Sequence, residues 1–278
     1  MPTTPTHAFL VSHTHWDREW YLTFARFRVQ LVETIDAILD QLESDPDFRH
    51  FCLDGQTLAL EDYLEARPEQ KDRIEDLVET GALALGPWYV LPDEFLVSGE
   101  ATVRNLQFGH ATAARFGGAQ KVGYLPDTFG HLGQMPQILQ QAGIDSFIYW
   151  RGHGDEIARL GLEWWWEAPD GSRVLAINQE DGYVNAAALG HAELWHAHTR
   201  RALDPEQAIT KIRNLFAKMS ARSRTGTWLL NNGCDHHPPQ REFGGMLAAL
   251  RTAYPDTRFI HGSLSEHVAA LRRDIGED

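Results

Sequence analysis

Cysteine is scarce in this sequence, which has only Cys52 and Cys234 among its 278 residues. Two cysteines cannot form a disulfide framework, and neither belongs to a C-x-x-C pair that would bind zinc or carry redox chemistry. Long apolar runs are also missing, since none approaches the length of a membrane-spanning helix. The first seven residues lack the basic flank and apolar core of a signal peptide. We therefore expect a protein of the reducing cytoplasm without a membrane partner.

Basic charge is in short supply as well. The chain has 25 Lys and Arg against 39 Asp and Glu, a formal net charge of −14. Non-specific binding to nucleic acid needs a basic face, so this class of partner is excluded. By contrast, a hydrophobic fraction of 43% is typical of a soluble globular protein, and nine tryptophans are unusually many. Exposed aromatic rings can cover the apolar faces of sugars in carbohydrate sites.

Short apolar segments alternate with segments that have apolar residues at helical spacing. This alternation predicts an α/β fold with a mostly parallel sheet and helical crossovers. No repeat or linker interrupts it, so we expect one domain over residues 1–278. Two segments joined by Pro-Asp-Gly, 163–167 and 173–177, are expected to form a β-hairpin. The other strands are predicted at 8–11, 48–53, 82–85, 122–125, 144–150, 227–230 and 259–260, and helices near 31–42, 58–64, 68–78, 99–116 and from 263.

The first candidate site follows the strand at residues 8–11. His15 and Asp17 are two residues apart, so in an extended segment their side chains leave on the same side. An imidazole nitrogen and a carboxylate oxygen placed in this way can bind a divalent metal such as zinc. A polar strand end that only caps a loop is the alternative. The two histidines, the acid and the two tryptophans within eight residues favour a site.

Three more candidates also follow predicted strands. Asp127 and Phe129 lie in a tight turn after residues 122–125, where an Asx-turn without function is the alternative. Asp235 lies in a turn rich in glycine and proline after residues 227–230, where a helix N-cap is the alternative. Arg151 follows residues 144–150 and could orient a hydroxyl-rich or anionic ligand, although a surface arginine on a loop is the usual outcome.

Seven motifs occur in order along the chain: H-T-H-W-D-R-E-W, L-D-G-Q-T, G-P-W-Y, S-x-E-x-x-x-R-N, G-Y-L-P-D-T-F-G-H, Y-W-R-G and N-G-C-D-H. This series resembles the N-terminal catalytic domain of glycoside hydrolase family 38, the α-mannosidases. It looks most like the bacterial branch that includes mannosylglycerate hydrolase. The resemblance covers nearly the whole chain, and it implies a seven-stranded, mostly parallel, barrel-like α/β domain.

The resemblance also implies a zinc ion and a pair of catalytic carboxyl groups. His15 and Asp17 match the zinc ligands of the first motif, and Asp127 matches the nucleophile, which also contacts zinc. Asp235 matches the general acid/base. A retaining glycosidase needs one ionised and one protonated carboxyl group about 5–5.5 Å apart. Zinc in this role would hold sugar hydroxyls rather than activate water.

Three further positions match substrate-binding residues of the family. Trp20 matches the tryptophan that lies under the sugar ring, and Phe129 and Arg151 match positions that contact the sugar. The substrate implied is a terminal α-mannoside, with mannosylglycerate-like compounds included.

One departure from the family pattern concerns the fourth zinc ligand. In the family this ligand is a His followed by Asp in a later helical segment, and no His-Asp pair follows Asp235 here. We therefore expect the first domain of a longer architecture, with a C-terminal partner half or a homo-oligomer completing it, and a poor mannosidase on its own.

Two other functions remain open at the level of sequence. A zinc-dependent sugar deacetylase would use an Asp and two His ligands, which His15, Asp17 and His236 could supply. A non-catalytic carbohydrate-binding or assembly module is the second alternative. The D-T-F-G-H and D-G-Q motifs favour the glycosidase over the deacetylase, and the presence of both Asp127 and Asp235 argues against a module that lost catalysis long ago.

Overall fold

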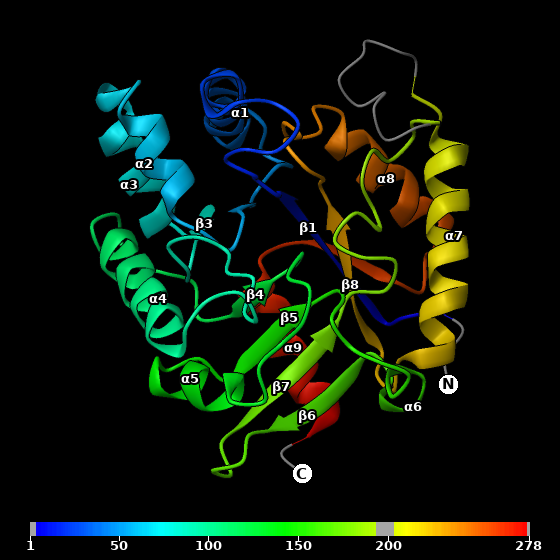
Figure 1. Ribbon diagram of the computed structural model, residues 1–278. Helices are drawn as coiled ribbons and strands as arrows, with labels where there is room; N and C mark the ends of the chain where they lie inside the picture. The colour runs from blue at the N-terminus through cyan, green and yellow to red at the C-terminus, as the bar shows by residue number, and fades with distance from the viewer. Residues whose placement is uncertain (1–3, 193–202, 277–278) are drawn as a thin grey trace.

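The computed structural model describes residues 4–192 and 203–276 (Figure 1). The first three residues of the segment considered for a signal peptide, and both ends of the expected domain 1–278, lie outside the described residues. No described helix is both long and apolar enough to cross a membrane.

Strands and helices alternate along the chain, as the sequence predicts. The strands are β1 (His7–Thr14), β2 (Phe51–Leu53), β3 (Leu83–Leu85), β4 (Gly123–Leu125), β5 (Ser146–Tyr149), β6 (Glu163–Glu167), β7 (Arg173–Asn178), β8 (Thr227–Asn232) and β9 (Arg258–His261). The helices are α1 (Phe24–Ser44), α2 (Leu58–Leu64), the 3₁₀ turn η1 (Pro68–Gln70), α3 (Lys71–Glu79), α4 (Gly99–Ala114), α5 (Met135–Gln141), α6 (Ile157–Leu160), α7 (Pro205–Arg222), α8 (Phe243–Ala253) and α9 (Leu264–Ile275).

The described strands form two sheets, which does not confirm the expected seven-stranded, barrel-like arrangement. One sheet has five strands in the order β3-β2-β1-β8, with β9 also pairing with β1, and the other has four in the order β4-β5-β7-β6. Every pair is parallel except β6 with β7, which is the predicted hairpin. The three-residue strands β3 and β4 each pair on one side only, so no backbone ladder closes a barrel within the described chain. The mostly parallel α/β fold itself is confirmed.

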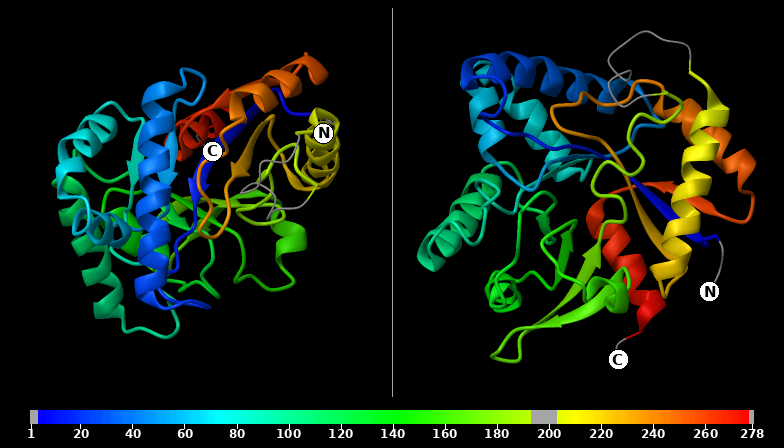
Figure 2. Two further views of the ribbon diagram at one scale, coloured as in Figure 1. Left: turned by 90° about the horizontal axis from the view of Figure 1, so that it is seen from above. Right: turned by 45° about the vertical axis from the view of Figure 1, so that its right-hand side comes forward.

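Helices surround the strands on several sides. In Figure 1, α2, α3 and α4 lie on one side of the strands and α7 and α8 on the other, and Figure 2 shows the same arrangement from two further directions. β1 is almost entirely buried between them, which explains its continuous apolar segment. Ser98 and Ser263 cap α4 and α9, and α9 begins with a complete capping box. The sequence did not predict α5, α6, α7 and α8.

Gly109 in α4 marks a place where a helix touches the loop after β3. A Cβ atom at this position would lie 2.2 Å from the carbonyl oxygen of Pro87 and 2.3 Å from the carbonyl carbon of Trp88. These are backbone atoms, which cannot move aside as a flexible side chain could. The close approach of α4 to this loop therefore requires glycine.

We expect Gly109→Ala to lower the free energy of unfolding by about 1–3 kcal/mol, because the new methyl group overpacks this contact. The matched control is Gly245→Ala in α8, where a Cβ would meet nothing within 4 Å. That change should instead raise the free energy of unfolding by about 0.5–1 kcal/mol, since alanine loses less conformational entropy in a helix. Urea unfolding followed by tryptophan fluorescence measures both. Equal effects of the two substitutions would contradict the close contact at Gly109.

Candidate active site

The parallel pairing of β1 with β8 brings two of the candidate residues together. The register joins His7 to Thr227 and continues to Ser12 and Asn232, a constant difference of 220 residues. An isolated bridge extends the same register to His15 and Asp235.

Two backbone hydrogen bonds hold this extension of the ladder. The amide of His15 donates to the carbonyl of Cys234 at 3.2 Å, and the amide of His236 donates to the carbonyl of His15 at 2.8 Å. Gly233 lies so close to β1 that a Cβ would be 2.0 Å from the carbonyl oxygen of His13. The glycine in the N-G-C-D-H motif therefore allows the tight approach that puts Asp235 beside His15.

His15 is buried among three carboxyl groups. Its Nε2 atom lies 3.6 Å from Asp17 Oδ1 and 3.9 Å from Asp127 Oδ2, and its Nδ1 atom lies 3.3 Å from Asp54 Oδ2. Burial alone would lower the pKa of His15, but Asp54 and Asp17 outweigh it and raise this pKa well above the ordinary value. The structure therefore brings together His15, Asp17 and Asp127, as predicted, and adds Asp54.

Asp54 is fully buried in the turn after β2 and has a left-handed backbone, with φ of 56°. Its carboxylate accepts hydrogen bonds from the amides of Trp16 at 3.0 Å and Gly55 at 2.8 Å, and from the Gln56 side chain at 2.8 Å. Its contact with His15 is an ion pair rather than a well-aligned hydrogen bond. Because Asp54 occupies the Nδ1 side of the ring, Nε2 faces Asp17 and Asp127.

Asp54 belongs to the L-D-G-Q-T motif, and no role for it was predicted from the sequence. Its position directly after a strand was the available signal, since side chains at the carboxyl ends of parallel strands gather at one edge.

Asp127 is held by Arg151, which the sequence analysis placed against a ligand. The guanidinium pairs with Asp127 Oδ1, and its Nε donates to the Asp127 carbonyl at 3.1 Å. The same guanidinium lies 3.9 Å from the centre of the Phe129 ring, which is 66% exposed. Burial raises the pKa of Asp127, although His15 and Arg151 act in the opposite direction. Arg151 therefore orients a carboxylate of the protein, and Phe129 presents an open face beside it.

Tyr183 is a second residue that the sequence analysis missed. Its hydroxyl donates to Asp235 Oδ1 at 2.8 Å, and its ring centre lies 5.2 Å from that of His15. Burial and the charges of Asp235 and Asp127 raise the pKa of Tyr183. The tyrosine follows β7 after an Asp-Gly turn, so the strand-end argument could have found it. It joins the carboxyl ends of the two sheets, since it reaches from β7 to residues that follow β1 and β8.

His236 is engaged in packing and in backbone contacts. Its ring stacks on Phe27 with centres 4.1 Å apart, and its Nε2 faces the backbone of Asp17, 3.0 Å from the carbonyl oxygen and 3.2 Å from the amide nitrogen. Burial lowers its pKa. An Nε2 atom used in this way is not aimed at the space between His15 and Asp127, which counts against a metal site of His15, Asp17 and His236.

Trp20 lies at the rim of the site. It is 64% exposed and packs edge-on against Tyr21, with ring centres 4.9 Å apart. Tyr21 in turn contacts His236 with ring centres 5.9 Å apart. The predicted aromatic surface is therefore present and open, next to the loop that carries Asp235.

The donor atoms around His15 fit zinc in type, since zinc binds imidazole nitrogen and carboxylate oxygen. The two distances from Nε2 to carboxylate oxygens are slightly longer than the roughly 3.4 Å expected between ligand atoms of a tetrahedral ion bound at about 2.0–2.1 Å. Within residues 4–192 and 203–276, however, no three His, Cys, Asp or Glu side chains form a ready metal cluster. Arg151 pairs with Asp127 Oδ1, whereas Oδ2 is the oxygen that lies toward His15.

The sequence matches the family description "Glycosyl hydrolases family 38 N-terminal domain" over residues 5–278. The chain belongs to this family. It is 36% identical over 282 aligned residues to a protein of Halalkalibacterium halodurans named "Putative mannosylglycerate hydrolase", and the match covers 98% of this chain and 30% of that protein. It is 31% identical to human "Alpha-mannosidase 2C1" over 59% of this chain and 16% of that protein.

Among solved structures, an α-mannosidase from Enterococcus faecalis is similar, with 35% identity and a TM-score of 0.87. The match covers 98% of this family 38 chain and 30% of that one. The match thus spans 30% of the Halalkalibacterium halodurans and Enterococcus faecalis proteins and 16% of the human one. A 4-α-glucanotransferase from Thermococcus litoralis has a TM-score of 0.62 at 14% identity, which shows a likeness of fold alone.

We expect Asp54→Asn to lower the free energy of unfolding by about 2–3 kcal/mol at pH 7, because it removes a buried charge that several donors share. Asp54 has a lowered pKa in the folded protein, since His15 and its hydrogen bonds outweigh the effect of burial. Its contribution is therefore present above the unfolded pKa of about 4 and is lost as the pH falls through the folded value. The difference between the two proteins should narrow below pH 4.

The matched control for this change is Asp62→Asn. Asp62 is also buried, but its partner Arg18 is 47% exposed, with nitrogen–oxygen distances of 2.7 and 3.0 Å. A solvated pair of this kind contributes about 1 kcal/mol or less. Urea unfolding at several pH values compares the two, and equal losses at pH 7 would contradict the special role of Asp54.

Proposed function

We propose that this family 38 domain carries the catalytic residues of a retaining α-mannosidase that cleaves terminal α-mannosides, mannosylglycerate-like compounds included. The observation that carries the proposal is the grouping of His15, Asp17, Asp127 and Asp235 at the carboxyl ends of strands from both sheets. The names of the similar proteins, which are mannosidases and a mannosylglycerate hydrolase, support the substrate class. Since those proteins are much longer, the activity is proposed for the architecture that contains this domain.

Asp127 is the proposed nucleophile and Asp235 the proposed acid/base. The Asp127 carboxylate attacks the anomeric carbon while the bond to the leaving-group oxygen breaks, and that oxygen takes the proton of Asp235. Water then attacks the same carbon, Asp235 accepts a proton from it, and Asp127 is released. Arg151 orients Asp127, and Tyr183 orients Asp235. Trp20 and Phe129 offer aromatic faces for the sugar.

His15, Asp17 and Asp127 are the proposed zinc ligands. When bound, zinc would supply a positive charge that favours the ionised form of Asp127 and would bind sugar hydroxyls. Asp54 supports this assignment because it lies against the opposite nitrogen of the His15 ring, as carboxylates often do behind a metal-binding histidine. A ligand from outside residues 1–278 would complete the coordination.

A zinc-dependent deacetylase is less well supported. It would need His236 as a ligand, and the Nε2 atom of that residue faces the backbone of Asp17. A polysaccharide-deacetylase-like structure from Mycobacterium smegmatis has a TM-score of 0.56 at 14% identity, which concerns the fold alone. A sugar-binding module would need neither Asp127 nor Asp235, so it leaves their grouping unexplained.

Substitution of Asp235 tests the acid/base assignment. We expect Asp235→Asn to lower kcat/KM by at least about 100-fold for α-mannosides with poor leaving groups, since these need protonation. The loss should be less than about tenfold for dinitrophenyl α-mannoside, whose leaving group needs little help from an acid. Steady-state kinetics of a protein that contains this domain provide the measurement. Equal losses for both substrates would contradict the assignment.

Substitution of His15 tests the metal assignment without relying on activity. We expect His15→Ala to weaken zinc binding by more than about 100-fold. Substituting a residue that only hydrogen-bonds to a metal ligand typically lowers metal affinity about 10–100-fold, and loss of the ligand itself should cost more. The control is His153→Ala, an exposed histidine outside this site, which should bind zinc as the unchanged protein does. Isothermal titration calorimetry with zinc measures both. Undiminished binding by His15→Ala would exclude this residue as a ligand.

A further inference from the structure

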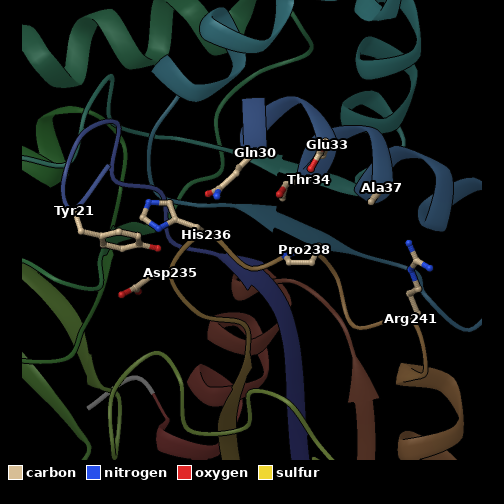
Figure 3. A pocket seen from close by; sticks show the side chains of 9 residues that line it. All are labelled: Tyr21, Gln30, Glu33, Thr34, Ala37, Asp235, His236, Pro238 and Arg241. Atoms are coloured by element: carbon tan, nitrogen blue, oxygen red, sulfur yellow. The ribbon is translucent and has the colours of Figure 1, made fainter. Parts of the chain in front are cut away.

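A cavity of about 470 Å³ leads away from Asp235 along α1. One wall is formed by Gln30, Glu33, Thr34 and Ala37, which share one face of the helix because they follow the spacing of 3.6 residues per turn. The loop after β8 forms the opposite wall. Figure 3 shows Asp235 at one end of this cavity and Arg241 at the other.

The shape of the cavity is elongated. Gln30 and Ala37 are seven residues apart, so the helical wall between them is about 10 Å long at a rise of 1.5 Å per residue. This exceeds the length of one sugar ring. A ligand that fills the cavity is therefore longer than one sugar ring or a small acid.

The position of the cavity relative to Asp235 determines which part of a substrate could enter it. A general acid protonates the oxygen that joins the sugar to its leaving group, so the leaving group begins at this residue. The Asp235 oxygen Oδ1 is occupied by Tyr183, and Asp235 also lines the cavity together with Tyr21. The cavity therefore begins where the leaving group begins, and Tyr21 offers it an aromatic face.

The polar groups of the walls are available to a ligand. Gln30, Glu33 and Arg241 are exposed, and none has an ion pair or a side-chain hydrogen bond within the described part of the chain. Together they offer an amide, a carboxylate and a guanidinium, which can donate to and accept from hydroxyl groups. Glu33 and Arg241 carry opposite charges, and Asp235 is protonated when it acts as the acid, so the walls have no net positive charge to attract an anionic ligand. Arg241, the one cation among the described lining residues, lies at the end away from Asp235, beyond the reach of a short acid linked to the sugar there (Figure 3).

We propose that this cavity binds the leaving group of the substrate and selects an uncharged, hydroxyl-rich chain of sugar units. The inference rests on the proposed role of Asp235 as acid/base. It adds a preference that the proposed function leaves open: an oligosaccharide is favoured over a short, charged aglycone such as glycerate.

The test uses isothermal titration calorimetry to compare the binding of α-linked mannotriose with that of free mannose, with sulfur in place of the glycosidic oxygens of the mannotriose so that a mannosidase does not hydrolyse it. Mannotriose can reach into the cavity, whereas mannose occupies one position only. We expect Ala37→Phe, which narrows the cavity at a half-buried position, to lower the ratio of the two affinities at least tenfold. The double change Gln30→Ala and Glu33→Ala at exposed positions should lower the ratio about tenfold, as expected for the loss of two hydrogen bonds, and guards against misfolding of the first variant.

The matched control is Val29→Phe, which adds the same ring to α1 at a position that is 62% exposed and does not line the cavity. Its ratio should equal that of the unchanged protein. An unaltered ratio in both cavity variants, or no gain of mannotriose over mannose in the unchanged protein, would overturn the proposal. So would tighter binding of mannosylglycerate, likewise linked through sulfur, than of mannotriose.

Hydrolysis of an aryl α-mannoside separates this proposal from the proposed function. If the protein hydrolyses the aryl mannoside but the cavity variants leave the ratio of mannotriose to mannose affinity unaltered, only the cavity proposal is contradicted. The protein could instead bind mannotriose in the cavity but hydrolyse no mannoside, even with the family's C-terminal region present. That result would contradict the proposed function and leave only a sugar-binding cavity.

Discussion

The parallel pairing of β1 with β8 is the constraint on which the site depends. These strands are more than 200 residues apart in sequence, and their register continues beyond the strands to join His15 with Asp235. A shift of one residue would turn alternate side chains to the other face of the sheet, so the register decides whether these two groups meet. Gly233 permits the register, because its missing Cβ leaves room for the carbonyl of His13.

The second sheet reaches the same place through another close backbone contact. A Cβ on Gly55 would lie 2.4 Å from the carbonyl oxygen of Tyr124, so the turn after β2 touches β4 directly. Asp54 and Asp127, which follow these two strands, therefore lie on either side of His15. Two open sheets can thus present their carboxyl ends to one site without a closed barrel.

At the site, the positively charged side chains lie directly against carboxylates. Three carboxyl groups surround His15, of which Asp54 and Asp17 raise its pKa, while Arg151 neutralises part of the charge of Asp127. The chain is strongly acidic as a whole, and the two cationic groups at this site are both held by carboxylates. The cavity along α1 differs from the site in this respect. Its polar side chains Gln30, Glu33 and Arg241 have no ion pair with another described residue, so they can bind a ligand.

The sequence by itself determined the class of the fold, the hairpin from β6 to β7 and most strand positions, because buried strands and amphipathic helices have local patterns. It also predicted His15, Asp17, Asp127 and Asp235 as candidate site residues, since each follows an apolar strand within a motif. Only the tertiary structure decided that nine described strands form two sheets, that Arg151 holds Asp127, and that Asp54 and Tyr183 belong to the site. These facts depend on which distant segments pair and how closely their backbones approach. Local spacing carries no information about either, because both follow from packing across the whole chain.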